Sequence, residues 1–212
     1  MKSYMYVLRH GTTEGNIKNW YYGRLDLPLS EQGIETLKNL KAQGIYPSAE
    51  GANCYTTGLL RTEQTLQILF GDVPHETIPT LQEMNFGAWE GMSYEEIGAS
   101  GIYPEYYERW QRLDMDESNL FKFPEGESVK EFYERIKKGK DELAGKHRLC
   151  ELSHRHDGKD AVTIMVCHGG VSAAIMHDFF PNQKNFWEWI PEPGHGYIIH
   201  FENSDAVSYE TI

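Results

Sequence analysis

Apolar and polar residues follow two kinds of pattern along this chain. Two short, almost uninterrupted apolar runs, 3–9 and 161–167, are typical of strands that are buried on both faces of a parallel sheet. Other segments place apolar residues at helical spacing or form weaker apolar runs between turn signals. They predict strands at 52–56 and 76–80, helices at 30–43, 59–70, 128–144 and 171–180, and a hairpin that turns at 203–205.

The order of these elements indicates the fold class. Strands that alternate with helices favour an α/β fold with a mostly parallel central sheet and helices on both of its faces. A length of 212 residues fits one domain, 1–212, with a helical insertion at about 92–123. The polar segment 151–160 is interpreted as a surface loop.

The charge balance excludes two classes of partner. Of the 212 residues, 40% are hydrophobic and 25% are charged, and the formal net charge is −12. This charge argues against nucleic acid, which needs a basic surface, and against anionic membrane surfaces. No apolar stretch is long enough to cross a bilayer. A phosphorylated ligand would therefore need a few locally placed Arg and His side chains to bind it.

Cysteine usage and the N-terminus favour a cytoplasmic protein. The three cysteines Cys54, Cys150 and Cys167 are scattered and have no CxxC spacing, so they suggest neither a disulfide framework nor a zinc site. The first eight residues lack a signal-peptide core. No heptad pattern or distinctive exposed strand predicts an oligomeric state.

Polar residues follow several of the predicted strands at the point where each strand ends. Arg9, His10 and Gly11 leave the first strand, and His168 and Gly169 leave the strand at 161–167. In open α/β sheets, ligands bind beyond the carboxyl ends of the strands, where helix N-termini offer free N–H groups. These residues are therefore candidates for a shared anion site.

Two further charged residues fit such a site. Arg61 lies in the first turn of the helix at 59–70, where a cation opposes the helix dipole unless an anion lies in front of it. Glu83 lies just past a strand end, although Glu14 and Glu90 are alternative carboxylates. Histidine, arginine and one carboxylate are what phosphoryl transfer to an imidazole requires: a nucleophile, cationic stabilisation and an acid for the leaving alcohol.

At this point the sequence resembles the histidine phosphatase superfamily, in the branch that contains cofactor-dependent phosphoglycerate mutase and related small bacterial phosphatases. The resemblance spans nearly the whole chain and rests on ordered motifs: Leu8-Arg9-His10-Gly11 with Asn16, Gly23 through Gly33, Leu60-Arg61-Thr62 with Thr65, Glu83 before Phe86-Gly87-Ala88-Trp89-Glu90-Gly91, Pro124 through Ser128, and His168-Gly169-Gly170. Together these motifs are highly specific.

The resemblance implies roles for the matching residues. His10 would accept the phosphoryl group, and Glu83 would act as general acid and then as general base. The phosphoryl oxygens would be held by Arg9, Arg61 and His168, assisted by Asn16, Gly23 and Gly169. The resemblance implies a small phosphorylated metabolite as partner and neither metal nor cofactor, and it implies that the insertion at 92–123 is a lid. Thr12-Thr13 and Thr57-Gly58 depart from the family's usual residues.

Several alternatives stay open at this stage. A phosphoglycerate mutase is the second interpretation, but the acidic, aromatic insertion favours a hydrolase, whose substrate could be a sugar phosphate, a nucleotide, α-ribazole phosphate or a phosphopeptide. A non-catalytic phosphate-binding regulator is a further alternative. His147, His154 and His156 could form a metal site, yet they are interpreted as part of a solvated loop. The aromatic groups at 20–22 and 103–110 fit either a substrate mouth or a packed core.

Overall fold

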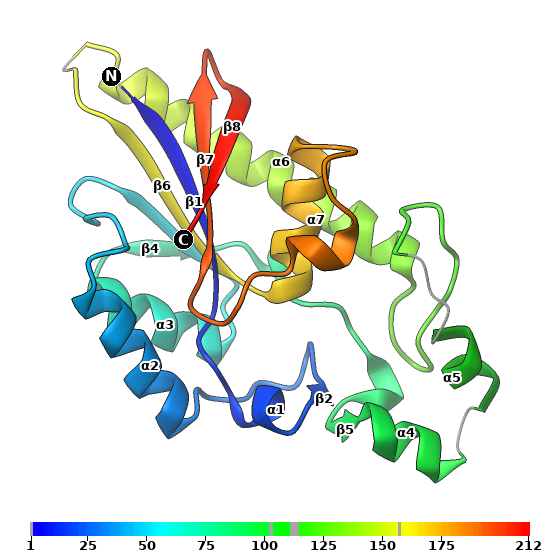
Figure 1. The fold of residues 1–212 in the computed structure, drawn as a ribbon. Helices are drawn as coiled ribbons and strands as arrows, with labels where there is room; N and C mark the ends of the chain where they lie inside the picture. Colours follow the sequence, from blue (N-terminus) through cyan, green and yellow to red (C-terminus); the bar gives the residue numbers. More distant parts are fainter. Residues whose placement is uncertain (1, 102–103, 111–114, 157) are drawn as a thin grey trace.

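The computed structural model describes residues 2–101, 104–110, 115–156 and 158–212. A six-stranded sheet of order β4-β3-β6-β1-β7-β8 forms its centre (Figure 1). Its strands are β1 (Ser3–Arg9), β3 (Asn53–Thr56), β4 (His75–Thr77), β6 (Ala161–Cys167), β7 (Gly196–Glu202) and β8 (Asp205–Thr211). Strands β4, β3, β6 and β1 are parallel, and β7 and β8 add an antiparallel hairpin. The expectation of a mostly parallel sheet is confirmed.

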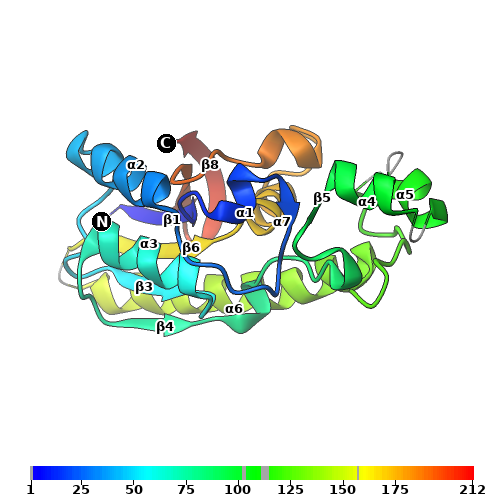
Figure 2. The same ribbon diagram turned by 90° about the horizontal axis from the view of Figure 1, so that it is seen from below.

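Helices cover both faces of this sheet, and a separate cluster of buried apolar residues lies between the sheet and each helical layer. On one face, α2 (Glu31–Ala42) and α3 (Leu60–Phe70) bury Leu37 and Leu66 against Leu8. On the other face, α6 (Val129–His154) and α7 (Gly169–Phe179) bury Phe132 and Val171 in the same cluster as Met5. Figure 2 shows these layers from below. Alternate residues of β1 thus face opposite layers, as a doubly covered sheet requires.

Short elements surround the carboxyl edge of the sheet. They are α1 (Glu14–Ile17), β2 (Trp20–Tyr21), η1 (Pro79–Leu81), η2 (Gly87–Trp89), β5 (Met92–Ser93), α4 (Tyr94–Ser100), α5 (Pro104–Trp110) and η3 (Phe186–Trp189). The expected insertion contains two short helices, α4 and α5, and β5 pairs it with β2. The remainder of that expectation, at 102–103 and 111–114, lies outside the described residues.

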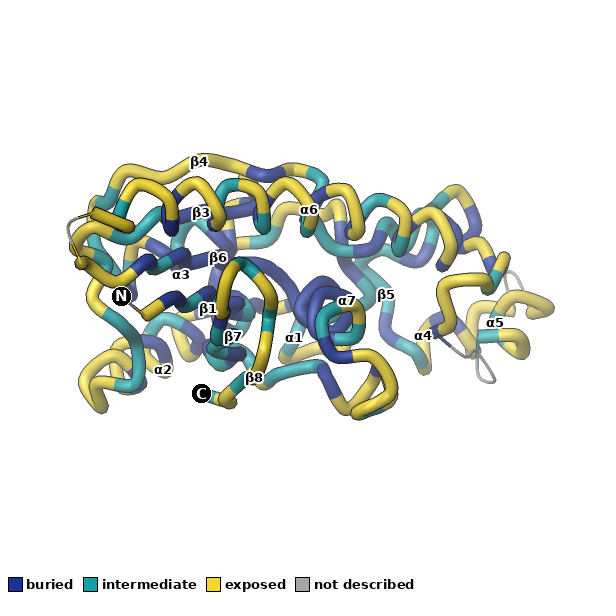
Figure 3. The backbone as a smooth tube through the Cα atoms, turned by 90° about the horizontal axis from the view of Figure 1, so that it is seen from above, coloured by how far each residue is buried: buried dark blue, intermediate teal, exposed yellow. Residues whose placement is uncertain are grey.

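The structure corrects the prediction for the segment after 144. Helix α6 continues to His154, so 151–154 are helical, and Figure 3 shows buried and exposed positions alternating along α6. His147 is buried, with 1% of its surface exposed, rather than in a solvated loop. Its Nδ1 lies 2.9 Å from Thr163 Oγ1 and its Nε2 lies 2.9 Å from Ser3 Oγ. The buried face runs through Leu143, His147 and Cys150, a helical spacing that is hidden when histidine is counted as polar.

Other boundaries differ by a few residues. Helix α7 begins at Gly169 rather than 171, and β4 covers His75–Thr77 rather than 76–80. The predicted hairpin is confirmed, with Asn203 and Ser204 between β7 and β8. Both residues have positive φ, 52° and 69°, as a two-residue hairpin turn of type I′ requires. None of the helices in the described ranges is long and apolar enough to cross a membrane.

Candidate active site

The ends of three parallel strands bring the predicted site residues together. In the register of the sheet, Arg9 at the end of β1 lies opposite Cys167 at the end of β6, so His10 and His168 leave the same edge. Strand β3 ends beside them at Thr56 and continues into α3, which carries Arg61. The rings of His10 and His168 lie edge to face with 5.3 Å between their centroids. The two histidines therefore share one site.

The His10 ring is held in one tautomer. Its Nδ1 lies 2.7 Å from the Gly11 carbonyl oxygen, which can only accept, so Nδ1 carries the proton and donates it. Only 3% of the His10 surface is exposed, and burial lowers the pKa of His10 well below its usual value of 6.5, aided by the positive charges of Arg61 and Arg9. The ring is therefore neutral near pH 7, with a free lone pair on Nε2.

Arg61 is a fully buried cation that is held by backbone carbonyls. Its Nη2 donates to the Gly23 carbonyl at 2.8 Å and its Nη1 to the Leu25 carbonyl at 3.0 Å. Each of these nitrogens has a second N–H group. Gly23 is required by close packing, because a Cβ there would lie 1.6 Å from the Met84 carbonyl oxygen. Arg61 is thus fixed before any ligand arrives.

His168 is oriented by two partners. Its Nδ1 accepts a hydrogen bond from Arg61 Nε at 3.3 Å, so its Nε2–H donates to Thr57 Oγ1 at 2.9 Å. Burial lowers the pKa of His168 well below 6.5, and the charge of Arg61 adds to this effect. His168 is therefore also neutral. The Thr57 hydroxyl thus supplies the contact that fixes the ring.

Arg9 presents an unpartnered donor at the start of α7. Its Nη1 donates to the Pro191 carbonyl at 2.7 Å, but its Nε is buried without a hydrogen-bond partner among the described residues. A Cβ on Gly169 would lie 3.2 Å from that Nε, so the glycine allows the guanidinium to lie against the helix N-terminus. A buried donor without a partner is costly unless a ligand satisfies it. This edge is therefore suited to an anion.

Glu83 faces the same helix N-terminus. Its Oε2 accepts from the backbone N–H of Gly170 at 2.9 Å, and its Oε1 accepts from that of Met84 at 2.9 Å. Arg135 Nη2, on α6, donates to the Glu83 carbonyl at 3.2 Å and forms an ion pair with both carboxylate oxygens of Glu127, at 2.7 and 3.0 Å. The loop that carries Glu83 is thereby tied to α6.

The two alternative carboxylates have other environments. Glu90 accepts hydrogen bonds from the backbone N–H groups of Gly23 at 3.2 Å and Arg24 at 2.8 Å, so it stabilises the loop beneath Arg61. Glu14 is exposed in the first turn of α1. Of the described carboxylates, Glu83 is the one that lines the pocket beside His10.

A pocket of about 200 Å³ connects these groups to solvent. Of the predicted residues, Arg9, His10, Asn16, Glu83 and Gly169 line it. Asn16 caps its own helix, since its Oδ1 accepts from Thr13 N at 3.0 Å, which leaves the Nδ2 amide as a donor. Three predicted residues lie behind the lining, where they contact one another: Gly23, Arg61 and His168.

The aromatic residues divide between the pocket and the core. Trp20, Tyr21, Tyr22 and Trp110 line the pocket, so the substrate-mouth interpretation describes their position. Tyr22 is also 93% buried, with 7% of its surface exposed. Tyr107 packs against the larger core cluster, and Tyr103 lies outside the described residues.

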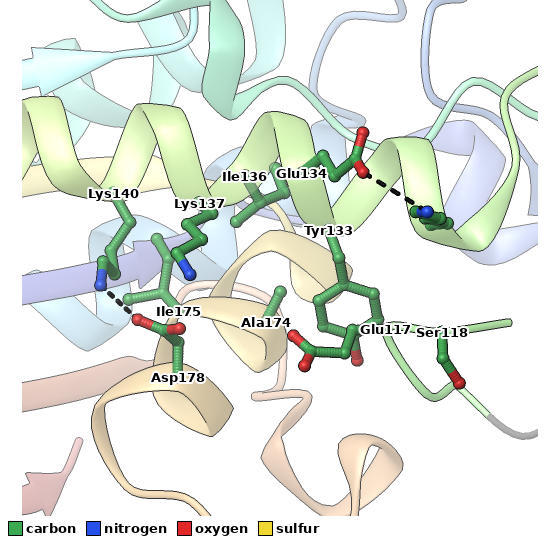
Figure 4. A pocket seen from close by; sticks show the side chains of 11 residues that line it. Glu117, Ser118, Tyr133, Glu134, Ile136, Lys137, Lys140, Ala174, Ile175 and Asp178 are labelled. Atoms are coloured by element: carbon green, nitrogen blue, oxygen red, sulfur yellow. Dashed lines mark hydrogen bonds and ion pairs between the residues drawn. The ribbon is translucent and has the colours of Figure 1, made fainter.

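A second cavity, of about 330 Å³, lies between α6 and α7 (Figure 4). Its lysines face acidic neighbours, and Lys140 forms an ion pair with Asp178. Neither histidine nor arginine is among its lining residues, so it lacks the groups that phosphoryl transfer to an imidazole needs. No group of three or more His, Cys, Asp or Glu side chains in the described ranges could hold a metal ion.

Three supporting residues were missed from the sequence. Thr57 fixes His168, Arg135 ties down the Glu83 loop, and Thr65 Oγ1 accepts from the Gly11 backbone N–H at 3.0 Å. Thr65 belongs to the motif Leu60-Arg61-Thr62 with Thr65, and that motif could have indicated its supporting role. No sequence signal indicated the role of Arg135, because an arginine on an amphipathic helix is ordinarily interpreted as a solvated side chain.

The chain is similar in sequence to several known proteins. The adenosylcobalamin/alpha-ribazole phosphatase of Escherichia coli K12 is 27% identical over 176 residues, which cover 81% of this chain and 76% of that protein. Phosphoglycerate mutase-like protein 4 of Arabidopsis thaliana is 27% identical over 183 residues, covering 84% and 71%.

Structure comparison supports the fold. A proposed alpha-ribazole-5′-P phosphatase from Escherichia coli K-12 superposes with a TM-score of 0.73 and 23% identity, covering 98% of this chain and 94% of that one. The family model of the histidine phosphatase superfamily, branch 1, matches residues 5–209. The chain therefore belongs to branch 1 of the histidine phosphatase superfamily.

Proposed function

We propose that this protein is a metal-independent phosphomonoester hydrolase that acts through a phosphohistidine on His10. The observation that carries the proposal is the state of the His10 ring, whose Nδ1 proton is bound to the Gly11 carbonyl and whose pKa is held well below 6.5. A neutral imidazole with a free Nε2 lone pair is a competent nucleophile at neutral pH. The relatives of this chain include proteins named as phosphatases and as mutases.

The proposed reaction has two steps. In the first, His10 Nε2 forms a bond to phosphorus, the bond from phosphorus to the ester oxygen breaks, and a protonated Glu83 gives its proton to the departing alcohol. In the second, water attacks the phosphohistidine, Glu83 takes one proton from that water, and the bond from phosphorus to Nε2 breaks. The products are the alcohol and inorganic phosphate, and His10 and Glu83 return to their initial states.

The cationic groups would stabilise the phosphoryl oxygens through both steps. Arg9 offers a buried Nε–H without a protein partner, and Arg61 offers the second N–H of each terminal nitrogen. Asn16 and the N–H of Gly169 would add neutral donors. His168, whose single N–H is bound to Thr57, would act by orienting Arg61, and Gly23 would act through its bond to Arg61. Donors that are fixed in advance stabilise transition-state charge without reorganisation.

Hydrolysis is favoured over phosphoglycerate mutase activity by the charge of the pocket. Arg9 is the only lysine or arginine among the described residues that line it, whereas a mutase has to hold a second anionic group of its substrate. We therefore propose a small phosphorylated metabolite as the substrate. Separately, the three scattered cysteines favour the cytoplasm as the site of action. The insertion at 92–123 would close over the pocket as a lid.

The test is turnover of 4-nitrophenyl phosphate in excess EDTA, with intact-mass analysis after a denaturing quench at neutral pH. The wild type is expected to turn over without added metal and to carry a transient phosphoryl adduct, and His10→Ala is expected to lose both. His75→Ala alters an exposed histidine on β4 and serves as the control. Absence of turnover and adduct in the wild type would favour a phosphate-binding regulator. Strict dependence on a divalent metal would refute the proposed chemistry.

A further inference from the structure

The outer part of the pocket has a surface of aromatic rings. Trp20 and Tyr21 come from β2, Phe86 precedes η2, Trp110 ends α5, and Phe186 and Trp187 belong to η3. Met84, Met115 and Ile190 fill the gaps between these rings. The phosphoryl-binding residues thus occupy the inner end, and whatever is esterified to the phosphate has to lie against the aromatic wall.

The rings form a preorganised wall because they bind one another. Trp110 Nε1 donates to the Tyr21 hydroxyl at 2.6 Å, and the Tyr21 ring lies edge-on to Phe86 at 5.2 Å between centroids. The edge of Trp110 meets Trp187 at 6.1 Å. Burial raises the pKa of Tyr21, so its hydroxyl stays uncharged. The wall therefore presents neutral ring surface from β2, α5 and η3 and from the residue before η2.

Trp187 is a solvent-exposed residue of this wall. It is 50% exposed, whereas its neighbours Phe186 and Trp189 in η3 are 7% and 0% exposed. A tryptophan with half of its surface in water at the mouth of a pocket is a ready stacking partner for a flat ring. By contrast, Lys18 already lies 4.7 Å from the centroid of the Trp20 ring.

The charge around the wall disfavours a second anionic group on the ligand. In the described part of the pocket the one basic side chain is Arg9, whose Nη1 is bound to Pro191 at the inner end. Helix α4 carries Glu95 and Glu96 in its first turn, and α5 carries Glu105 in its first turn and Arg109 in its last. A carboxylate or second phosphate against the neutral rings of Trp110 and Trp187, away from Lys18 at Trp20, would lose its hydration without gaining a partner.

The volume of the pocket limits the size of the ligand. At about 200 Å³ it is smaller than the roughly 300–1,000 Å³ of pockets that hold drug-sized ligands. A fused bicyclic ring on a short linker fits this scale better than a peptide or a long chain does.

We infer that the preferred substrates are monophosphate esters of small alcohols that carry an uncharged aromatic or heteroaromatic ring, with Trp187 as the residue that stacks on that ring. This inference rests on the proposed hydrolase activity. It assigns selection of the leaving alcohol to the wall formed by β2, α5 and η3. The groups around His10, which would bind the phosphoryl group, do not contribute to that selection.

The test compares three alkyl phosphates whose leaving alcohols have similar basicity: 2-(1-naphthyl)ethyl, 2-cyclohexylethyl and 2-(4-carboxyphenyl)ethyl phosphate. The naphthyl ester is expected to exceed the cyclohexyl ester in kcat/KM by several-fold to about tenfold, the range that aromatic pairing adds beyond area burial. The carboxylated ester is expected to be the poorest of the three. Matched basicity separates ring recognition from leaving-group reactivity.

Variants test whether Trp187 is the source of the preference for the naphthyl ester. Trp187→Ala should abolish the preference for naphthyl over cyclohexyl. Leu149→Ala, at a 66% exposed site on α6 outside the pocket, should change neither that preference nor the rate with ethyl phosphate. Equal kcat/KM for the two uncharged esters, a preference for the carboxylated ester, or an unchanged preference in Trp187→Ala would overturn the inference while hydrolysis stands. Failure of every ester and of 4-nitrophenyl phosphate would overturn the hydrolase proposal itself.

Discussion

Replacing Gly170 with alanine tests the position of Glu83 directly. A Cβ at residue 170 would lie 2.7 Å from Glu83 Oε1 and 3.3 Å from its Cδ and Oε2. Ordinary contact begins near 3.4 Å, so the carboxylate has to retreat by roughly 0.7 Å and weaken the hydrogen bond that Gly170 N donates to it at 2.9 Å. Misplacement of about 1 Å can cost 10²-fold in rate, so we expect kcat to fall by about 10- to 100-fold.

The stability of the fold should change far less than the rate. The atoms that must move are the end of a flexible side chain, and alanine gains up to about 1 kcal/mol over glycine in a helix. The free energy of unfolding in urea should therefore stay within about 1 kcal/mol of the wild type. Gly145→Ala, on α6, is the matched control, because a Cβ there meets no atom within 4 Å.

Two substrates identify which step is affected. If Glu83 protonates the leaving oxygen, Gly170→Ala should lose much more activity with an alkyl phosphate than with 4-nitrophenyl phosphate, whose leaving group needs little protonation. An unchanged kcat with both substrates would refute the steric reasoning. In single-turnover measurements of phosphohistidine formation, an equal loss with both substrates would refute the role of Glu83 as general acid.

Two further predictions follow from buried titratable groups. The pKa of His147 is lowered by burial to about 4. Since this lies below its unfolded value of 6.5, the unfolded chain binds the proton more strongly and stability is lost as pH falls from about 6.5 to about 4. His147→Gln should therefore reduce the loss of unfolding free energy between pH 7 and pH 5 by about 2 kcal/mol, and an identical loss in both proteins would contradict this. Burial also raises the pKa of Cys167 to about 12, so iodoacetamide should modify it only after unfolding, as mass spectrometry of tryptic peptides would show.

The sequence predicted the parts of the site that depend on chain direction. His10 and His168 each follow a buried strand, and parallel strands place their carboxyl ends at one edge whatever the details of packing. Arg61 was recognised because a cation in the first turn of α3 is unfavourable unless something negative lies near it. These inferences needed only local sequence and the topology of the sheet.

The parts that were missed depend on contacts between distant segments. Arg135 holds the carbonyls of Thr80, Gln82 and Glu83 from more than 50 positions away, and no local pattern distinguishes it from a surface arginine. His147 was misplaced for a related reason. Its polar ring is buried because Ser3 and Thr163 satisfy both of its nitrogens, and those partners lie on β1 and β6.

The arrangement of charge is compatible with the proposed phosphate site in a protein of net charge −12. Arg61 donates to the carbonyls of Gly23 and Leu25, and Arg9 donates to that of Pro191, so both cations are oriented by neutral dipoles and keep their charge for a ligand. The two histidines are kept neutral by burial beside these cations. The two guanidinium charges of Arg9 and Arg61 match the two negative charges of a phosphomonoester dianion. A ligand with a further negative charge would exceed that balance, which agrees with an uncharged leaving group at the aromatic wall.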